Sequence, residues 1–201
     1  MTDAKKTPVE LLNEIAHLGF LDALEIVALI EVMERQNQGR IDGKLSDGGA
    51  AAAGIVIRNS LITRITILVA RPFGPVRKGD LHLRRAFDDL LIIPAIRDHI
   101  HHIGANSDML EAERLWIEVD ADPLRTKFKH FRDKYTAHLG EPTPGIANPE
   151  YIDFFSFARK TTRVMEKLAH ATRGTDETLD EHYNDFIQSA QNFWKPWDPM
   201  A

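Results

Sequence analysis

The segment Asp122–His138, DPLRTKFKHFRDKYTAH, carries the helical pattern from which the fold can be argued. Asp122 can cap a helix whose first residue is Pro123, where the missing N–H does no harm. At about 100° per residue, the side chains of the stripe that follow Leu124 all fall within roughly 40° of it. The sequence therefore predicts an amphipathic helix with an aromatic face and a histidine at its end. The stripe consists of Leu124, Phe128, Phe131, Tyr135 and His138.

Positive charge borders this stripe on both sides. Five cations against one acid give the helix a local charge of +4, whereas the whole chain carries −5. Any site for a polyanion in so acidic a chain has to be local, and this helix is the candidate, although such charge runs also occur on solvated helix faces. One flank holds Arg125, Lys129 and Arg132, and the other holds Lys127 and Lys134.

The same helical periodicity recurs on the N-terminal side of this segment, and no stretch alternates as a hairpin strand does. Thr7–Glu10 has the form of a capping box and predicts a helix start. Gly39–Gly49 contains four glycines and predicts a loop. Residues 50–70 are rich in isoleucine and valine, which also suit a strand, but their spacing favours a helix. That spacing is seen in Ile57, Leu61, Ile65 and Leu68.

The C-terminal side contains two more predicted helices. Gly140 and Pro142 end the motif helix, Asn148-Pro149 is expected to open the next one, and Pro196 ends the last. We therefore expect an all-α bundle of about six to seven helices. Residues 1–201 would form a single domain, with residues 149–195 as two C-terminal helices packed on the same core.

Several classes of protein can be excluded or disfavoured. The chain has no cysteine, so disulfide frameworks, thiolate metal sites and cysteine nucleophiles are excluded. The N-terminus lacks the apolar core of a signal peptide, and Arg58, Asn59 and Arg64 interrupt the most apolar stretch. We expect a soluble, cytoplasmic protein that does not enter a membrane.

Metal-ligand residue types occur, but in patterns that do not complete a site. Within Asp98–His102, DHIHH, only residues three or four apart share a helix face, and no third ligand follows on that face. Glu14 and His17 match one half of a di-iron element whose second copy is missing. Glu166 and His170 can pair with each other as easily as bind metal. We expect neither a metal nor a cofactor.

The string Arg132–His138, RDKYTAH, resembles the motif of the HEPN superfamily, the higher eukaryote and prokaryote nucleotide-binding domains. That motif is an arginine, a polar residue, a short variable stretch and a histidine. Arg132, Asp133 and His138 match it, and Ala137 suits the small residue that often precedes the histidine. The longer string FRDKYTAHL is similar to the abortive-infection AbiU-type branch. The resemblance implies a HEPN-like helical bundle with the motif at the end of a late helix, although here two helices follow it.

The resemblance also implies a chemistry. Active members cleave RNA without metal, because the ribose 2′-hydroxyl attacks its neighbouring phosphate and leaves a 2′,3′-cyclic phosphate. Such a reaction needs a proton carrier that titrates near neutrality and a cation at the developing charge. By this resemblance His138 and Arg132 are catalytic, and Asp133 supports the arginine. The expected substrate-binding residues are Arg125, Lys129, Lys134 and, in a secondary role, Tyr135.

The spacing within the motif argues for a second copy of the chain. On an ideal α-helix, Arg132 and His138 diverge by about 120°, which is a poor arrangement for gripping one phosphate. Either the helix end unwinds, or two motifs meet across a two-fold axis. HEPN relatives commonly do the latter, so we expect a homodimer through the Arg132–His138 region.

Two functions remain open from the sequence. The first is a metal-independent endoribonuclease that acts as an abortive-infection or toxin-like effector, for which a nucleotidyltransferase-like antitoxin is a further expected partner. The alternative is a non-catalytic HEPN-like dimer that binds a nucleotide, RNA or a protein partner, with Arg132 and His138 serving structure. The net acidity of the chain favours the alternative, since an indiscriminate RNA binder usually carries more positive charge.

Overall fold

The computed structural model describes residues 6–37, 39–77, 79–137 and 141–198. Over these ranges the chain forms helices joined by turns and loops, with no strand, so the all-α prediction is confirmed. His138 lies outside the described residues. The α-helices are α1 (Pro8–Gln36), α2 (Gly39–Asp47), α3 (Ala51–Ala70), α4 (Leu83–Arg85), α5 (Pro94–His102), α6 (Asn106–Asp120), α7 (Pro123–Phe131), α8 (Tyr151–Ala171) and α9 (Leu179–Trp194). Shorter elements are the 3₁₀ turns η1 (Arg71–Phe73) and η4 (Lys195–Trp197) and the π-helical segments η2 (Ala86–Leu90) and η3 (Arg132–Ala137).

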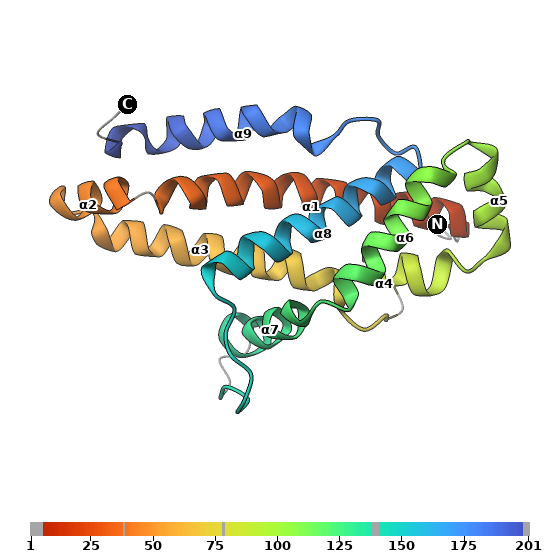
Figure 1. Cartoon of the computed structure of the whole chain (residues 1–201), viewed down its shortest axis with the longest axis horizontal. Helices are drawn as coiled ribbons and strands as arrows, with labels where there is room; N and C mark the ends of the chain where they lie inside the picture. The colour runs from red at the N-terminus through yellow and green to blue at the C-terminus, as the bar shows by residue number, and fades with distance from the viewer. Residues whose placement is uncertain (1–5, 38, 78, 138–140, 199–201) are drawn as a thin grey trace, which may run out of the picture.

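The long helix α1 forms the axis of the molecule (Figure 1). It begins with the predicted capping box, in which the Thr7 hydroxyl accepts from the Glu10 N–H at 3.2 Å and the Glu10 carboxylate accepts from the Thr7 N–H at 2.8 Å. Helices α3, α8 and α9 all pack against it. Because they approach from different directions, α1 buries apolar residues on more than one face.

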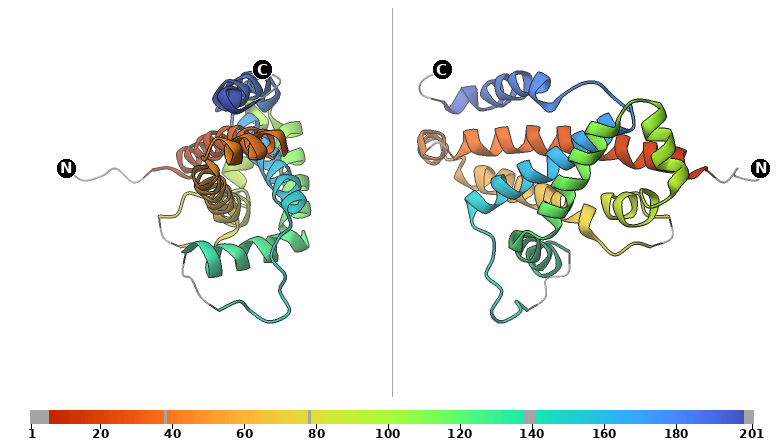
Figure 2. Two further views of the ribbon diagram at one scale, coloured as in Figure 1. Left: turned by 90° about the vertical axis from the view of Figure 1, so that its left-hand side faces the viewer. Right: turned by 45° about the vertical axis from the view of Figure 1, so that its right-hand side comes forward.

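The helices around α1 are arranged in layers. In Figure 2, α9, α1, α3 and α7 lie one beneath another, while α8 crosses α1 and packs on α6. The main core runs through α1, α3, α6 and α8 and includes Phe157, which is fully buried. A second cluster of Ile41, Leu45 and Trp194 joins α2 to α9.

The predicted loop over Gly39–Gly49 is wrong, because Gly39–Asp47 forms the helix α2. Glycine lowers helix propensity, but Ile41 and Leu45 are four residues apart and bury one face against Trp194. Tertiary burial therefore outweighs local preference here. In the described residues this helix and the single turn α4 bring the number of α-helices to nine, above the six to seven expected.

The predicted start of the next-to-last helix is also displaced. Asn148-Pro149 was expected to open it, whereas α8 begins at Tyr151. The carboxylate of Asp153 accepts from the backbone N–H of Glu150 at 3.0 Å, so the first turn is closed by an acid instead of an asparagine cap.

Helix α3 buries only a minority of its residues, most of them in its C-terminal part. Together with η1 it is long and apolar enough to cross a membrane by length and composition alone, and only 28% of its most apolar window is buried. It is nevertheless fastened to its neighbours, because Arg64 pairs with Glu25 of α1 at 2.6 Å and Arg58 pairs with Asp42 of α2. The expectation that the chain does not enter a membrane stays a prediction.

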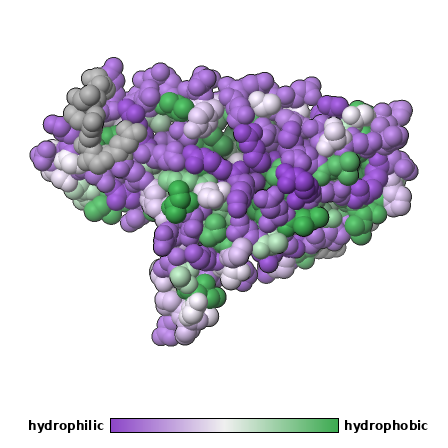
Figure 3. Space-filling view, in the orientation of Figure 1, coloured by the Kyte–Doolittle hydropathy of each residue, from purple (hydrophilic) through white to green (hydrophobic). Residues whose placement is uncertain are grey.

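Exposed apolar side chains are dispersed over the described surface. Ile55 and Val56 of α3 and Leu110 and Ile117 of α6 are more than half exposed. On the face shown in Figure 3, hydrophobic residues occur in separate groups among hydrophilic ones.

The buried Trp194 gives a test of how α9 is held. Its side chain is 1% exposed and its indole N–H donates to the Val32 carbonyl at 2.9 Å, whereas the neighbouring Phe193 is 54% exposed. We expect Trp194→Ala to lower the free energy of unfolding by about 3–5 kcal/mol, and Phe193→Ala by about 1 kcal/mol or less. Urea denaturation of both variants measures this, and equal losses would contradict the anchoring role of Trp194.

Candidate functional site

A cavity of about 420 Å³ lies where the end of α3, η1, α4, α7 and α8 meet. Among the described residues, the charged side chains that line it are all cationic. Its floor is apolar and largely aromatic. We call this cavity the cationic pocket. Its cations are Arg84, Arg125, Lys129 and Arg132, and its floor includes Ala70, Phe73, Phe128 and Phe157.

The rotation of α7 about its axis decides which of its cations reach the pocket. Asp122 caps the helix as predicted, accepting from the Leu124 N–H at 2.9 Å. Phe128 is 1% exposed, and its ring lies 4.8 Å from that of Phe154 and 5.0 Å from that of Phe157. With Phe128 buried against α8, the flank whose cations are spaced four and then three residues apart points into the pocket. That flank is Arg125, Lys129 and Arg132.

Arg132 and Asp133 form a local ion pair at the start of η3. Both Nε and Nη2 of Arg132 donate to Oδ1 of Asp133, at 2.8 and 2.6 Å. Lys129 donates to the other carboxylate oxygen at 3.3 Å. Burial alone would raise the pKa of Asp133, but the hydrogen bonds and charges of Arg132 and Lys129 lower it below its ordinary value. Asp133 is therefore a charged partner of two cations.

Arg84 enters the same pocket from a different part of the chain. Its guanidinium lies 5.4 Å from the ring centroid of Trp116 and donates to Asp88 at 3.1 Å. It also shares one carboxylate oxygen of Asp120 with Arg125. An aromatic ring and two acids thus hold Arg84 in place.

The structure brings together only some of the residues expected from the sequence. Lys134 and Tyr135 do not line the pocket, and Tyr135 is 39% exposed although the apolar stripe predicted packing. Its ring stacks on that of Phe131 at 5.2 Å. Lys127 points the other way and pairs with Asp153 of α8 at 3.1 Å. His138, the expected catalytic histidine, is outside the described residues.

The helix carrying the motif departs from the ideal geometry assumed from the sequence. Arg132–Ala137 is π-helical, so each residue advances by less than the 100° of an α-helix. The ideal α-helical rotation assumed from the sequence therefore does not hold over Arg132–Ala137, and the expected divergence between Arg132 and His138 falls on a residue outside the described ones. A second π-helical segment, Ala86–Leu90, begins two residues after Arg84. Such segments are rare and are often found at functional sites, and both adjoin cations of this pocket.

Two features of this region were missed in the sequence. Arg84 belongs to a second basic stretch, residues 71–85, which has five cations and one acid. This local excess of positive charge is the sequence signal that could have identified Arg84. His130 of α7 is only 6% exposed and its Nε2 has no hydrogen-bond partner, although it does not line the pocket. Its ring meets that of Tyr135 edge-on at 6.2 Å.

Metal-ligand residue types do not gather elsewhere in the part of the chain that the structure describes. No group of three or more histidine, aspartate or glutamate residues is placed there to hold an ion. His101, from the DHIHH string, instead contacts the side chain of Asn106 at 2.6 Å. The use of a metal or cofactor stays untested.

Over the described residues the chain is all-helical, and an arginine–aspartate pair begins a late helical segment in the string RDKYTAH, which resembles the HEPN motif. In a comparison with protein-family models, the model of the HEPN family described as AbiU2 matches residues 9–193. The chain therefore belongs to the HEPN AbiU2 family, which confirms the resemblance seen in the sequence. Comparisons with curated proteins and with solved structures find no match.

The lowered pKa of Asp133 predicts how its contribution to stability depends on pH. A carboxyl whose folded pKa lies below its unfolded value, about 3.9, stabilises the fold above that value and loses its effect as the pH falls through the folded pKa. We expect Asp133→Asn to lower the free energy of unfolding at pH 7 by about 1 kcal/mol at most, because the pair is partly solvated. The difference from wild type should shrink below pH ~4.

Urea denaturation across pH measures this difference, with Asp185→Asn on the exposed face of α9 as the matched control. A difference that is constant from pH 7 to pH 3, or that is equal for the two variants, would remove the charged role of Asp133.

Proposed function

We propose that this chain is a metal-independent endoribonuclease whose cationic pocket holds the phosphate backbone of RNA. The observation that carries the proposal is the convergence of Arg84, Arg125, Lys129 and Arg132 on one cavity of an otherwise acidic protein. Arginine and lysine side chains that line a groove neutralise the charge of backbone phosphates. Membership of the HEPN AbiU2 family supports the choice of RNA chemistry.

The pocket suits a phosphate with a nucleoside beside it. The half-buried ring of Phe73 lies on the apolar floor, stacked on Trp116 at 5.3 Å, and offers a surface on which a base can pack. Arg84 and Arg125 are already oriented by Asp120, so binding a phosphate costs little additional ordering of their side chains.

The proposed reaction is an internal transfer at phosphorus. The 2′-oxygen forms a bond to the adjacent phosphorus, and the bond from phosphorus to the 5′-oxygen of the next nucleotide breaks. One proton leaves the 2′-hydroxyl and one reaches the departing 5′-oxygen, which gives a 2′,3′-cyclic phosphate and a 5′-hydroxyl. In this proposal His138 carries protons and Arg132, supported by Asp133, stabilises the charge that develops on the phosphoryl oxygens.

The proposal includes a second copy of the chain and a biological setting. We infer a homodimer in which the Arg132–His138 regions meet, so that each reaction centre draws on two motifs. The family name is consistent with an abortive-infection effector in phage defence, and a nucleotidyltransferase-like antitoxin is a candidate partner. Both follow from the family resemblance.

One observation favours a non-catalytic alternative. Two N–H groups of Arg132 are committed to Asp133. In that case the HEPN-like dimer binds a nucleotide, RNA or a protein without cleaving it, and Arg132 and His138 serve structure.

Cleavage assays separate the two functions. We expect wild-type protein to cut RNA in the presence of a chelator and to leave 2′,3′-cyclic phosphate ends, whereas His138→Ala and Arg132→Ala lose about 10²-fold or more in rate. End analysis by mass spectrometry identifies the product. Equal cleavage by wild type and His138→Ala, or none by wild type over a broad set of RNAs, would remove the nuclease proposal.

Mixing the two inactive variants tests the composite site. If two motifs build one centre, heterodimers of Arg132→Ala and His138→Ala regain part of the activity that neither variant has alone. Recovery requires subunit exchange, which a labelled pull-down measures in the same sample. Exchange without recovery, or a protein that is monomeric at assay concentration, would contradict the shared centre.

RNA binding distinguishes the pocket from the general charge of its helix. We expect Arg84→Ala to weaken binding and to reduce the slope of log K against log salt by about 0.7, because one phosphate contact to a single strand is lost. Lys134→Ala removes the same charge outside the pocket lining and should change the slope less. Fluorescence anisotropy over a salt series measures both, and equal slopes for the two variants would contradict the assignment of Arg84.

A further inference from the structure

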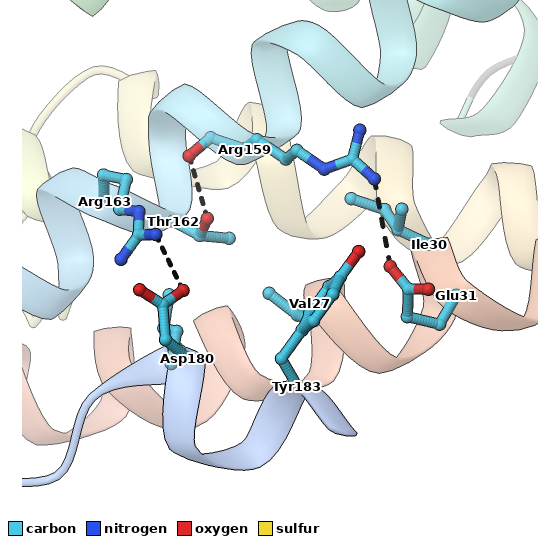
Figure 4. A pocket seen from close by; sticks show the side chains of 9 residues that line it. Val27, Ile30, Glu31, Arg159, Thr162, Arg163, Asp180 and Tyr183 are labelled. Atoms are coloured by element: carbon cyan, nitrogen blue, oxygen red, sulfur yellow. Dashed lines mark hydrogen bonds and ion pairs between the residues drawn. The ribbon is translucent and has the colours of Figure 1, made fainter. Parts of the chain in front are cut away.

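A second cavity, of about 220 Å³, lies between α1, α8 and α9, and none of its lining residues lines the cationic pocket. Figure 4 shows polar side chains from all three helices directed toward it. Its apolar surface comes from Val27 and Ile30 of α1 and Leu179 of α9. We call it the α9 pocket.

Glu31 is the under-satisfied group in the α9 pocket. Its side chain is nearly buried, at 8% exposure, and its Oε1 has no hydrogen-bond partner. The closest cation, Arg159, is 3.8 Å from that oxygen and donates instead to Glu34 at 2.9 Å. Desolvation raises the pKa of Glu31, and the charge of Glu34 raises it further. A buried carboxylate in this state gains free energy from any donor that reaches its open oxygen.

The other polar groups around this cavity already have partners. Arg163 donates to both Glu166 and Asp180, each at 2.8 Å. The Thr162 hydroxyl donates to the backbone carbonyl of Arg159 at 2.9 Å (Figure 4). The Thr162 hydrogen is therefore already donated, and two of the five N–H donors of Arg163 already face carboxylates.

The local charge also selects against an anion. Two guanidiniums, Arg159 and Arg163, are shared among four carboxylates, so these six groups carry −2 when all are ionised. The remaining wall is the ring of Tyr183. A carboxylate beside an aromatic ring and an aliphatic surface is an arrangement that binds organic ammonium groups.

We propose that the α9 pocket binds a small alkylammonium ligand, whose N–H donates to Oε1 of Glu31 while its aliphatic part packs on Val27, Ile30 and Leu179. The cavity is smaller than the few hundred Å³ of a typical drug-sized site, which suits a short amine. The bound ligand contacts α1 and α9 together and therefore stabilises the docking of α9.

Titration of the purified full-length chain with n-butylammonium chloride tests this proposal, with n-butanol as the uncharged analogue and sodium chloride at matched ionic strength. We expect saturable binding of n-butylammonium near the millimolar range, because so small a ligand makes few contacts. Glu31→Gln should weaken it by about tenfold or more, since a charged hydrogen bond is lost. Asp185→Asn, an exposed acid of α9 outside the pocket lining, should leave it within about twofold.

Calorimetry and the shift in thermal midpoint give two readouts of the same binding. Glu31→Gln removes a buried charge while keeping its shape, so we expect it to fold. If it does not, Tyr183→Ala on the partly exposed wall of the pocket replaces it and should also weaken binding. Equal binding of n-butanol, tighter binding of inorganic phosphate, or no saturable binding of n-butylammonium would overturn the proposal.

Discussion

The burial of Phe128 against Phe154 and Phe157 of α8 is the contact on which the candidate site depends. A helix that carries cations on both flanks can present only one flank to a given cavity. With the Phe128 ring buried among other rings, α7 cannot turn without exposing it, and its flank beginning at Arg125 faces the cationic pocket. Packing of apolar side chains thus decides where charge is concentrated.

The charge itself is organised by a small number of acids. Asp120 pairs with Arg84 and Arg125, Asp133 pairs with Lys129 and Arg132, and Asp88 also pairs with Arg84. Four cations thus converge with three carboxylates behind them. None of these acids lines the cavity. A chain with a net charge of −5 can therefore display a positive surface at one place, because its acids orient cations there instead of repelling them.

Local patterns in the sequence predicted what local physics determines. The Asp122 cap, the capping box at Thr7 and the helical spacing in 50–70 each involve residues within a few turns, and all three are seen in the structure. Helix α2 was missed because its stability comes from burial against Trp194, far along the chain. Arg84 was missed for the same reason, since only the folded chain brings it beside Arg125. The π-helical segment that begins at Arg132 was not predicted either, because the residue spacing was interpreted with ideal α-helical geometry.

Helix α8 borders both cavities. Phe157 belongs to the floor of the cationic pocket, and Arg159, two residues later, lines the α9 pocket on another face of the same helix. A helix shared in this way links the occupancies of the two cavities thermodynamically if each ligand binds more tightly to one position of the helix than to another. By reciprocity, the factor by which one ligand changes the affinity for the other is the same in both directions. Helix α8 would then couple ligand binding at the two pockets, in addition to contributing to the core.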